Sequence, residues 1–347
     1  MKVWEVQSKE GLDALTLVEK PEPQPKAGQV LLKMRAASLN YRDLLTVKAA
    51  YGSKQKLPFV PFSDGVGEVV AIGDGAKRPF QKGDGTKCPL QKGDRVAGIF
   101  MQTWLEGEFS ADKSKSALGG AIDGILAEYV TLDADGVVHV PEHLSDEEAA
   151  SLPCAAVTAW NALTTDGKLK PGDTVLVQGT GGVSLFALQF AKIMGARVIA
   201  TSSSDLKLDK LKQLGASEVI NYKTTPNWDE KVWELTNEVG VDRIIEVGGA
   251  GTFNKSLRAI RYGGYISLIG VLSGFNADVS TASILHKGVT VQGIYVGSRV
   301  MFEAMNQAIA LHNIKPIVDR VFPFQEARQA LEYMESGAHF GKIAVRF

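Results

Sequence analysis

The chain has 347 residues, with 38 basic and 39 acidic side chains and a formal net charge of −1. This length exceeds what one hydrophobic core usually serves, so we expect two domains. A hydrophobic fraction of 45% with 22% charged residues excludes a disordered chain. Because acidic and basic residues are evenly mixed, we expect no binding to nucleic acid or to a membrane surface.

The cysteine content and the apolar runs of the sequence indicate the cellular compartment in which the protein resides. Cys88 and Cys154 lie far apart in the sequence, which argues against a disulfide framework. The sequence shows no secretory leader and no apolar run that would span a bilayer, so we expect a cytoplasmic protein.

The first third of the chain is rich in short β-like runs separated by Gly, Pro and Asp, which predicts a compact β-rich domain. The expected strands cover residues 1–6, 15–18, 30–36, 67–72, 95–98 and 129–132. Within this part, Gln81-Lys-Gly-Asp84 recurs as Gln91-Lys-Gly-Asp94. We interpret this near-duplication, in an insertion at 74–92, as a lengthened surface loop, because insertions into exposed loops cost little free energy.

From about Thr174 the pattern changes to apolar strands that alternate with amphipathic helices, which predicts a parallel, doubly wound sheet. These strands are expected at 174–178, 197–200, 218–221, 241–247, 265–270 and 289–296. A helix near 301–311 follows, and the closing segment 342–347 is expected to rejoin the first domain. The prediction is therefore an α/β protein with a catalytic domain at 1–153 and 302–347 and a dinucleotide-binding domain at 154–301.

The strongest motif is Gly179-Thr180-Gly181-Gly182-Val183-Ser184, between a predicted strand and a predicted helix. Gly179 permits the tight turn, and Gly181 lets the backbone approach a pyrophosphate at the helix N-terminus. Ser184 stands where a third glycine is usual, and its small side chain still permits close packing. We therefore predict a dinucleotide site that includes Gly179 to Val183, with Gly248 as a further contact.

In such a domain, the residues at the end of the second strand indicate whether NADH or NADPH is bound. An NAD site places a carboxylate near its end, about 20 residues on, where this chain has Thr201-Ser202-Ser203-Ser204. We predict that Ser202, Ser203 and Lys207 receive a 2′-phosphate and that Tyr222 lies against the adenosine. Asp205 is counter-evidence, although it also suits a helix N-cap. NADPH is the cofactor expected.

Several motifs resemble those of the medium-chain dehydrogenase/reductases in the same order along nearly the whole chain: Asn40-Tyr-Arg-Asp43, Gly93-Asp-Arg-Val96, Ala127-Glu-Tyr-Val130, the glycine motif, and Gly341-Lys-Ile343. Within this family the chain is most similar to the zinc-independent quinone oxidoreductase and enoyl reductase branch. The resemblance implies a GroES-like catalytic domain, a Rossmann domain, an active site in the cleft between them, and a homodimer formed through the edge strand at 289–296.

The resemblance also bears on metal. Zinc alcohol dehydrogenases of this family use Cys, His and Cys as catalytic ligands, and the corresponding positions here are Asn40, Ser63 and Cys154. One thiol cannot hold a catalytic zinc. The four cysteines of the family's structural zinc lobe are absent too, because Cys88 stands alone. No metal site is expected, and Cys154 is expected to be a small buried residue.

Without a Lewis acid, reduction of a simple ketone is difficult, whereas quinones and α,β-unsaturated carbonyls delocalise the charge that hydride addition creates. Tyr41 and Tyr51 are the candidate proton donors or orienting groups, because a phenol can donate a hydrogen bond to a developing enolate. Asn40 is the candidate partner of the substrate or of the nicotinamide amide. Asp43 could instead pair with a neighbouring N–H or cation.

The sequence thus predicts an NADPH-dependent, zinc-free oxidoreductase that acts on a quinone or another conjugated carbonyl, a small-molecule electrophile. Three alternatives stay open. They are an NADPH-dependent enoyl-thioester or 2-alkenal reductase, a non-catalytic NADPH-binding protein, and a zinc-type alcohol dehydrogenase.

Overall fold

The computed structural model describes residues 1–50, 56–76, 79–81, 87–165 and 167–347. The chain forms two compact units. Unit 1 comprises Met1–Val157 and Gly297–Phe347, and unit 2 comprises Thr158–Val296. The sequence predicts boundaries at 153/154 and 301/302. No helix in the described ranges is long and apolar enough to cross a bilayer.

Unit 1 is the β-rich unit, and it combines the first part of the chain with the C-terminal segment. Its strands are β1 (Lys2–Val6), β2 (Leu15–Glu19), β3 (Gln29–Ser38), β4 (Asp64–Ile72), β5 (Pro79–Gln81), β6 (Lys87–Pro89), β7 (Arg95–Gly98), β8 (Tyr129–Asp133), β9 (Val137–His139), β16 (Val318–Pro323) and β17 (Lys342–Arg346). Its helices are α1 (Tyr41–Val47), α2 (Ala111–Ser114), α3 (Asp146–Ala150), α10 (Arg299–Leu311) and α11 (Ala327–Glu335).

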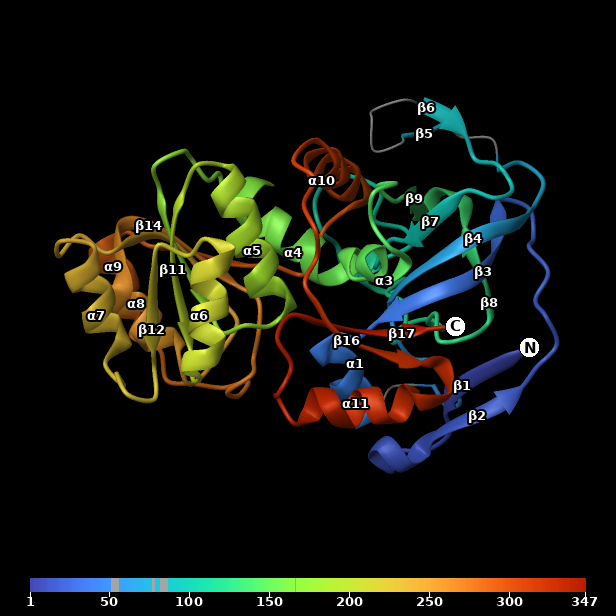
Figure 1. The fold of residues 1–347 in the computed structure, drawn as a ribbon, viewed down its shortest axis with the longest axis horizontal. Coiled ribbons are helices and arrows are strands. Elements are labelled where there is room, and N and C mark those ends of the chain that lie inside the picture. The colour runs from blue at the N-terminus through green and yellow to red at the C-terminus, as the bar shows by residue number, and fades with distance from the viewer. Residues whose placement is uncertain (51–55, 77–78, 82–86, 166) are drawn as a thin grey trace. The chain divides into compact units, whose positions relative to one another are not determined.

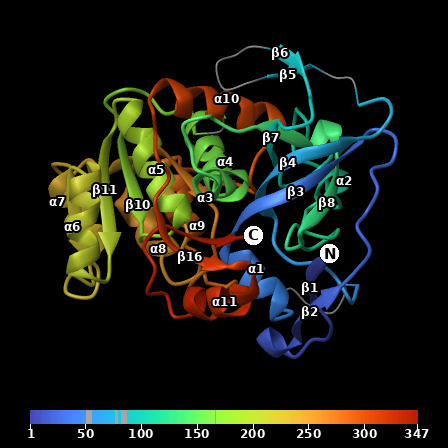
Figure 2. The same ribbon diagram turned by 45° about the vertical axis from the view of Figure 1, so that its right-hand side comes forward.

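The main sheet of unit 1 has the strand order β16-β17-β3-β4-β7-β9, and β8 also pairs with β3. Strand β17 runs antiparallel to β3, with Ala344 opposite Ser38. The closing segment therefore rejoins the first unit, as the sequence predicts. Helix α11 lies beside α1 in both views (Figures 1 and 2). The last strand is thus placed next to the start of α1, which matters for the polar cluster described below.

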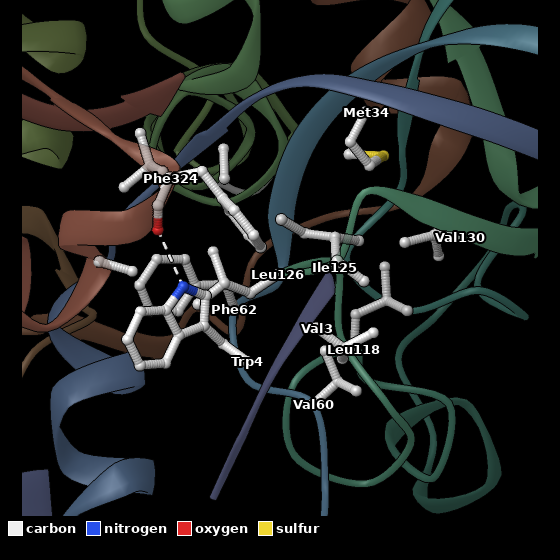
Figure 3. Packing of buried hydrophobic residues seen from close by; sticks show 14 of the residues in the cluster. Val3, Trp4, Met34, Val60, Phe62, Leu118, Ile125, Leu126, Val130 and Phe324 are labelled. Carbon is white, nitrogen blue, oxygen red and sulfur yellow. Dashed lines mark hydrogen bonds between the residues drawn. The ribbon is translucent and has the colours of Figure 1, made fainter. Parts of the chain in front are cut away.

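A buried apolar cluster holds unit 1 together. Trp4, Phe62 and Ile125 lie within it, and the Trp4 indole N–H donates to the Phe324 carbonyl at 2.8 Å (Figure 3). This bond satisfies the polar atom of a large buried ring, as buried tryptophans require. It also ties the first strand to the C-terminal part of the chain.

The insertion between β4 and β7 departs from the simple loop expected from the sequence. Strands β5 and β6 pair antiparallel, with Phe80 opposite Cys88, so part of the insertion is a hairpin. Residues 82–86 lie outside the described residues.

Unit 2 contains the parallel sheet that the sequence predicts. Its strands are β10 (Thr174–Gln178), β11 (Arg197–Ser202), β12 (Glu218–Asn221), β13 (Val241–Glu246), β14 (Ile260–Leu268) and β15 (Thr290–Gly293), in the order β12-β11-β10-β13-β14-β15. Its helices are α5 (Gly182–Ile193), α6 (Asp205–Leu214), α7 (Trp228–Leu235), α8 (Phe253–Ala259) and α9 (Thr281–Lys287). Helical turns at η3 (Leu152–Ala156), α4 (Val157–Trp160) and η4 (Asn161–Thr165) lead into it.

Every neighbouring pair of strands described in this sheet is parallel. Ile199 and Ile244 form one core cluster with Trp228 of α7 and Leu257 of α8, so these helices cover one face. Figure 1 shows helices on both sides of the strands, with α5 and α6 on the other face. The result is an α/β protein with a GroES-like unit and a Rossmann-like unit, which confirms the predicted fold class.

Candidate functional site

The glycine motif forms a turn between β10 and α5. Gly179 has φ +73°, a conformation that favours glycine, and its N–H donates to the Thr201 carbonyl at 2.9 Å. Gly181 is the N-cap of α5, and a Cβ at Gly179 or Gly181 would meet no atom within 4 Å. The turn therefore presents open space in front of the N-terminus of a 12-residue helix. Such an end binds anions through its unpaired N–H groups and its dipole.

The rest of the motif packs this helix against the strand. Ser184 is buried, and its hydroxyl donates to the Gln178 carbonyl at 2.6 Å. The serine thus replaces the usual third glycine without separating helix from strand. Thr180 is buried, whereas Gly182 and Val183 are partly exposed at the open side of the turn. These positions fit the pyrophosphate of a dinucleotide.

The residues predicted to bind the 2′-phosphate and the adenosine lie at or just after the ends of β11 and β12. Ser202 is the last residue of β11, and its carbonyl accepts the Tyr222 N–H at 3.0 Å. Ser203 and Lys207 are partly exposed, and Tyr222 is 41% exposed. The structure therefore brings Ser202 and Tyr222 together and places Lys207 in the first turn of α6.

Asp205 is not the helix N-cap that the sequence suggests. Ser204 is the N-cap of α6, and Asp205 is its first helical residue. The Asp205 carboxylate accepts the Asn221 amide at 2.7 Å. The N-cap prediction was wrong because the extended backbone ends one residue earlier, and the carboxylate is instead engaged by the neighbouring strand.

Gly248 follows β13 in a tightly packed loop. Its N–H donates to Glu246 Oε1 at 2.8 Å, and its carbonyl accepts the Ser273 N–H at 2.7 Å. A Cβ at this position would lie 2.2 Å from Thr252 Oγ1. The glycine is therefore required by local packing, and its contact with a cofactor stays a prediction.

The predicted catalytic residues belong to the start of α1. Asn40 is the N-cap residue with extended backbone and is 8% exposed. Tyr41 is 42% exposed, and its hydroxyl has no hydrogen-bond partner among the described residues. Tyr51 lies outside the described residues.

The side chain of Asn40 is part of a buried polar cluster. Lys342, on β17 and only 3% exposed, donates its ammonium to Asn40 Oδ1 and to the Leu39 carbonyl, each at 2.6 Å. The Asn40 amide group donates to Ser63 Oγ at 3.5 Å, and Ser63 donates to Asp64 Oδ1 at 2.7 Å. Because an ammonium can only donate, it fixes which end of the Asn40 amide faces which neighbour.

Cys154 adjoins this cluster. Its backbone N–H donates to Asp64 Oδ2 at 3.0 Å. The sequence predicts a small buried residue here, and the structure shows a partly buried one. Desolvation, reinforced by the Asp64 carboxylate, raises the pKa of the Cys154 thiol, and the thiol is therefore held neutral. Burial likewise raises the pKa of Asp64, although Lys342 opposes that change.

Asp43 is a structural partner, as one reading of the sequence suggests. Its Oδ2 accepts the Asn40 N–H at 2.7 Å, and its Oδ1 lies 3.7 Å from Arg42. Burial raises the pKa of Asp43 to about 6, while the Arg42 guanidinium opposes this. Asp43 therefore stabilises the start of α1 and is a poor candidate for contact with substrate.

The donor set around Asn40 does not fit a catalytic zinc. An amide, a hydroxyl and a single thiol stand where zinc enzymes of the family have two thiolates and an imidazole. The Lys342 ammonium already occupies Asn40 Oδ1 and would repel a divalent cation. Across the described ranges, no three His, Cys, Asp or Glu side chains form a group that could hold a metal ion.

Sequence reasoning missed three participants in these clusters. Lys342 was noted only as part of a motif, although a lone lysine at the start of an apolar strand is a signal. Glu246 ends the apolar run 241–247, and Gln178 ends β10. A charged or amide side chain at the end of a buried strand must find a partner, and these two find each other at 2.8 Å.

Each of the two units contains a segment that matches a known domain family. Residues 26–142 match the alcohol dehydrogenase GroES-like domain, and residues 182–312 match the zinc-binding dehydrogenase domain. A zinc-type alcohol dehydrogenase-like protein of Schizosaccharomyces pombe is 44% identical, over 97% of this chain and 96% of its own. A putative alcohol dehydrogenase of Sinorhizobium meliloti has a solved structure with TM-score 0.89 and 39% identity over 100% of both chains. The chain belongs to the medium-chain dehydrogenase/reductase superfamily and is an oxidoreductase.

Other relatives differ in chemistry. An acryloyl-coenzyme A reductase of Metallosphaera sedula is 30% identical over 94% of each chain. A mycobacterial structure in complex with NADPH matches with TM-score 0.82 and 28% identity over 100% of both chains. A mycobacterial quinone oxidoreductase is also among the structural neighbours. The acceptors named for these relatives thus differ, and one of the similar structures holds NADPH.

Proposed function

We propose that this chain is a zinc-independent, NADPH-dependent oxidoreductase of the quinone oxidoreductase-like branch, which reduces a quinone or another conjugated carbonyl. The observation that carries the proposal is the bond from the buried Lys342 ammonium to Asn40 Oδ1. It places a fixed positive charge beside the first of the three positions where zinc enzymes of the family have ligands. A site of this kind is built around hydrogen bonds rather than around a Lewis acid.

The chemistry follows from what these groups can donate. NADPH, when bound, supplies the hydride. Asn40, whose carbonyl end is engaged by Lys342, offers its N–H groups to an electron-rich oxygen, and their 3.5 Å contact with Ser63 is weak enough to be exchanged. Tyr41, exposed at the start of α1, supplies or orients a proton. Such hydrogen bonds suffice for acceptors whose charge is delocalised by conjugation.

The cofactor preference rests on the ends of β11 and β12. Hydroxyls at Ser202 and Ser203 and the cation of Lys207 suit a 2′-phosphate, and the Asp205 carboxylate is already bound by Asn221. We expect NADPH to bind at least tenfold more tightly than NADH, a difference of about 1.4 kcal/mol. Equal affinities, measured by titrating cofactor fluorescence, would remove the argument for a 2′-phosphate site.

A second candidate within the same chemistry is reduction of an enoyl thioester or a 2-alkenal. The acryloyl-coenzyme A reductase relative favours it. A quinone and an enoyl thioester need the same hydride transfer and differ in the acceptor that must be accommodated. Steady-state rates with matched panels of quinones, enones and enoyl-coenzyme A substrates decide between them.

The decisive experiment combines metal analysis with these rates. We expect less than stoichiometric zinc by elemental analysis, no loss of activity with a chelator, and turnover of conjugated acceptors with NADPH. Stoichiometric zinc together with chelator-sensitive oxidation of simple alcohols would support the zinc-type alcohol dehydrogenase alternative. Tight NADPH binding without turnover of any acceptor would support a non-catalytic NADPH-binding protein.

We also propose that the protein forms a homodimer through β15. This strand lies at the edge of its sheet, and Gln292 in its middle is exposed. Exposed edge strands pair readily with a second copy. We expect a dimer by light scattering and a monomer for Gln292→Pro, because proline cannot donate to a strand ladder. A dimer that survives this substitution would place the interface elsewhere.

A cytoplasmic location completes the proposal. It is supported by the low cysteine count, two in 347 residues, and by the free thiol of Cys154. Fractionation of cells that express the full chain tests it.

A further inference from the structure

The order of the parallel strands locates a special position in unit 2. Strands β10 and β13 are neighbours although β11 and β12 lie between them in sequence, so the winding of the sheet reverses between β10 and β13. Ligands of open α/β sheets bind outside the carboxyl ends of the strands at this reversal. Gln178 ends β10 and Glu246 ends β13, so these two residues mark that position.

Glu246 is completely buried there, and it gathers a dense set of donors. Its Oε2 accepts Gln178 Nε2 at 2.8 Å and the Ser256 hydroxyl. Its Oε1 accepts the backbone N–H groups of Gly248 and Gly249 at 2.8 and 3.0 Å, and the Thr252 hydroxyl at 2.5 Å. Both oxygens are thus satisfied by groups from the described residues, which offsets the cost of burying a carboxylate.

Three of these donors belong to two different parts of the proposed cofactor site. Gln178 directly precedes the Gly179 turn, and its own carbonyl accepts Ser184 of α5. Gly248 and Gly249 belong to the loop that follows β13, and Gly249 has φ +82°. The loop is further fixed by Ser273, which donates to the Gly248 carbonyl.

We infer that Glu246 is a positioning residue of the cofactor site, whose carboxylate holds the Gly248–Gly249 loop at a fixed distance from the glycine turn after β10. This inference rests on the proposed NADPH binding and adds a residue to that site. Glu246 itself is buried beneath the two loops, so it acts through Gln178, Gly248 and Gly249 rather than through contact with the cofactor.

The test is the isosteric variant Glu246→Gln. A glutamine offers one neutral carbonyl oxygen in place of two carboxylate oxygens, so the N–H groups of Gly248 and Gly249 lose their acceptor or keep a weaker one. We expect the Kd for NADPH, measured by cofactor fluorescence, to rise at least tenfold. In the cofactor-free protein we expect the amides of Gly248 and Gly249 to exchange hydrogen faster. The matched control Glu230→Gln, on the exposed side of α7, should change neither quantity.

A double variant separates loop positioning from the link between strands. The double variant Gln178→Glu with Glu246→Gln exchanges the acid and the amide. A hydrogen bond between a carboxylate and an amide can then form again between β10 and β13, but the carboxylate no longer faces the Gly248–Gly249 loop. We expect the unfolding midpoint to recover and the NADPH affinity to stay low. Full recovery of NADPH affinity in the double variant, or an unchanged Kd and unchanged exchange in Glu246→Gln, overturns the inference.

Should Glu246→Gln fail to fold, Thr252→Val provides the same test in milder form, because it removes one donor from Oε1 and keeps the carboxylate. We expect about a threefold rise in Kd and faster exchange at Gly249, and no change in either would again overturn the inference. Absence of NADPH binding by the wild-type chain would defeat the proposed function alone, since the exchange measurement needs no cofactor.

Discussion

Lys342 Nζ lies 2.6 Å from Asn40 Oδ1, so the last strand of the chain fixes the side chain at the start of α1. Both residues are buried, and the ammonium also satisfies the Leu39 carbonyl. Without this cation the Asn40 amide could turn over, because its two ends have nearly the same shape. The bond therefore defines Asn40 as a donor toward Ser63 and toward any oxygen placed beside it.

The substitution Lys342→Met tests this relationship. It leaves Asn40 Oδ1 and the Leu39 carbonyl without a donor and removes the cation that faces Asp64. Removing one member of a buried charged network costs about 3 kcal/mol of unfolding free energy, which urea denaturation measures. We also expect kcat to fall while the Kd for NADPH stays unchanged. Lys48→Met, which breaks a surface contact with Glu335, should cost less than about 1 kcal/mol. Equal losses for the two variants would contradict the assignment.

The raised pKa of Asp43 implies that the free energy of unfolding depends on pH. Burial raises its pKa in the folded chain to about 6, above the ordinary value of 3.8. A raised carboxyl pKa means that the folded state binds the proton more tightly. The associated stability is fully present below pH 3.8 and is lost as pH rises through 6, by at most about 3 kcal/mol.

The variant Asp43→Asn removes this dependence, because an amide can still accept the Asn40 N–H but does not ionise. We expect the variant to gain stability relative to wild type between pH 4.5 and pH 7.5, as measured by urea unfolding at both pH values. Asp112→Asn serves as control, since the Asp112 side chain is 90% exposed. A difference between Asp43→Asn and wild type that is constant with pH would show that Asp43 does not titrate in this range.

Substitution by alanine should have different effects at Gly179 and Gly181, the two glycines of the turn between β10 and α5. Gly179 has φ +73°, so Gly179→Ala strains the backbone and should lower stability by about 1 kcal/mol or more. Gly181 has φ −78° as the N-cap of α5, and a methyl group there meets no protein atom. Gly181→Ala should keep the unfolding midpoint nearly unchanged and still weaken NADPH binding at least tenfold, because the methyl group occupies the open space before the helix. Unchanged binding in Gly181→Ala would show that the pyrophosphate lies elsewhere.

Much of unit 2 could be predicted because its signals are local. The strands at 174–178 and 218–221 were predicted with the bounds that the structure has, since buried parallel strands are short apolar runs bounded by turn residues. The strand at 289–296 is shorter, Thr290–Gly293, and β14 begins at Ile260 rather than near 265. Strand ends depend on pairing with neighbours, which a local pattern does not contain.

The polar clusters could be predicted only in part. Asn40 and Ser63 were identified by their motif positions, but their partner Lys342 lies 302 residues from Asn40 in the sequence. The same holds for Gln178 and Glu246, which are 68 residues apart. Hydrogen bonds of this kind are set by strand order and register, so sequence reasoning could name some members of each cluster but not their arrangement.

Lys207 is the residue on which the choice between the two nicotinamide cofactors can be tested most directly. It lies in the first turn of α6, shortly after Ser202 at the end of β11 and the following Ser203, where a 2′-phosphate would be received. We expect Lys207→Gln to raise the Kd for NADPH about tenfold and to leave the Kd for NADH unchanged, because only the phosphorylated cofactor loses a charge-assisted hydrogen bond. Lys210→Gln on the same helix keeps the change in net charge identical and should alter neither Kd. A parallel loss of NADH and NADPH affinity in Lys207→Gln would mean that the lysine supports the fold of this helix start rather than the recognition of phosphate.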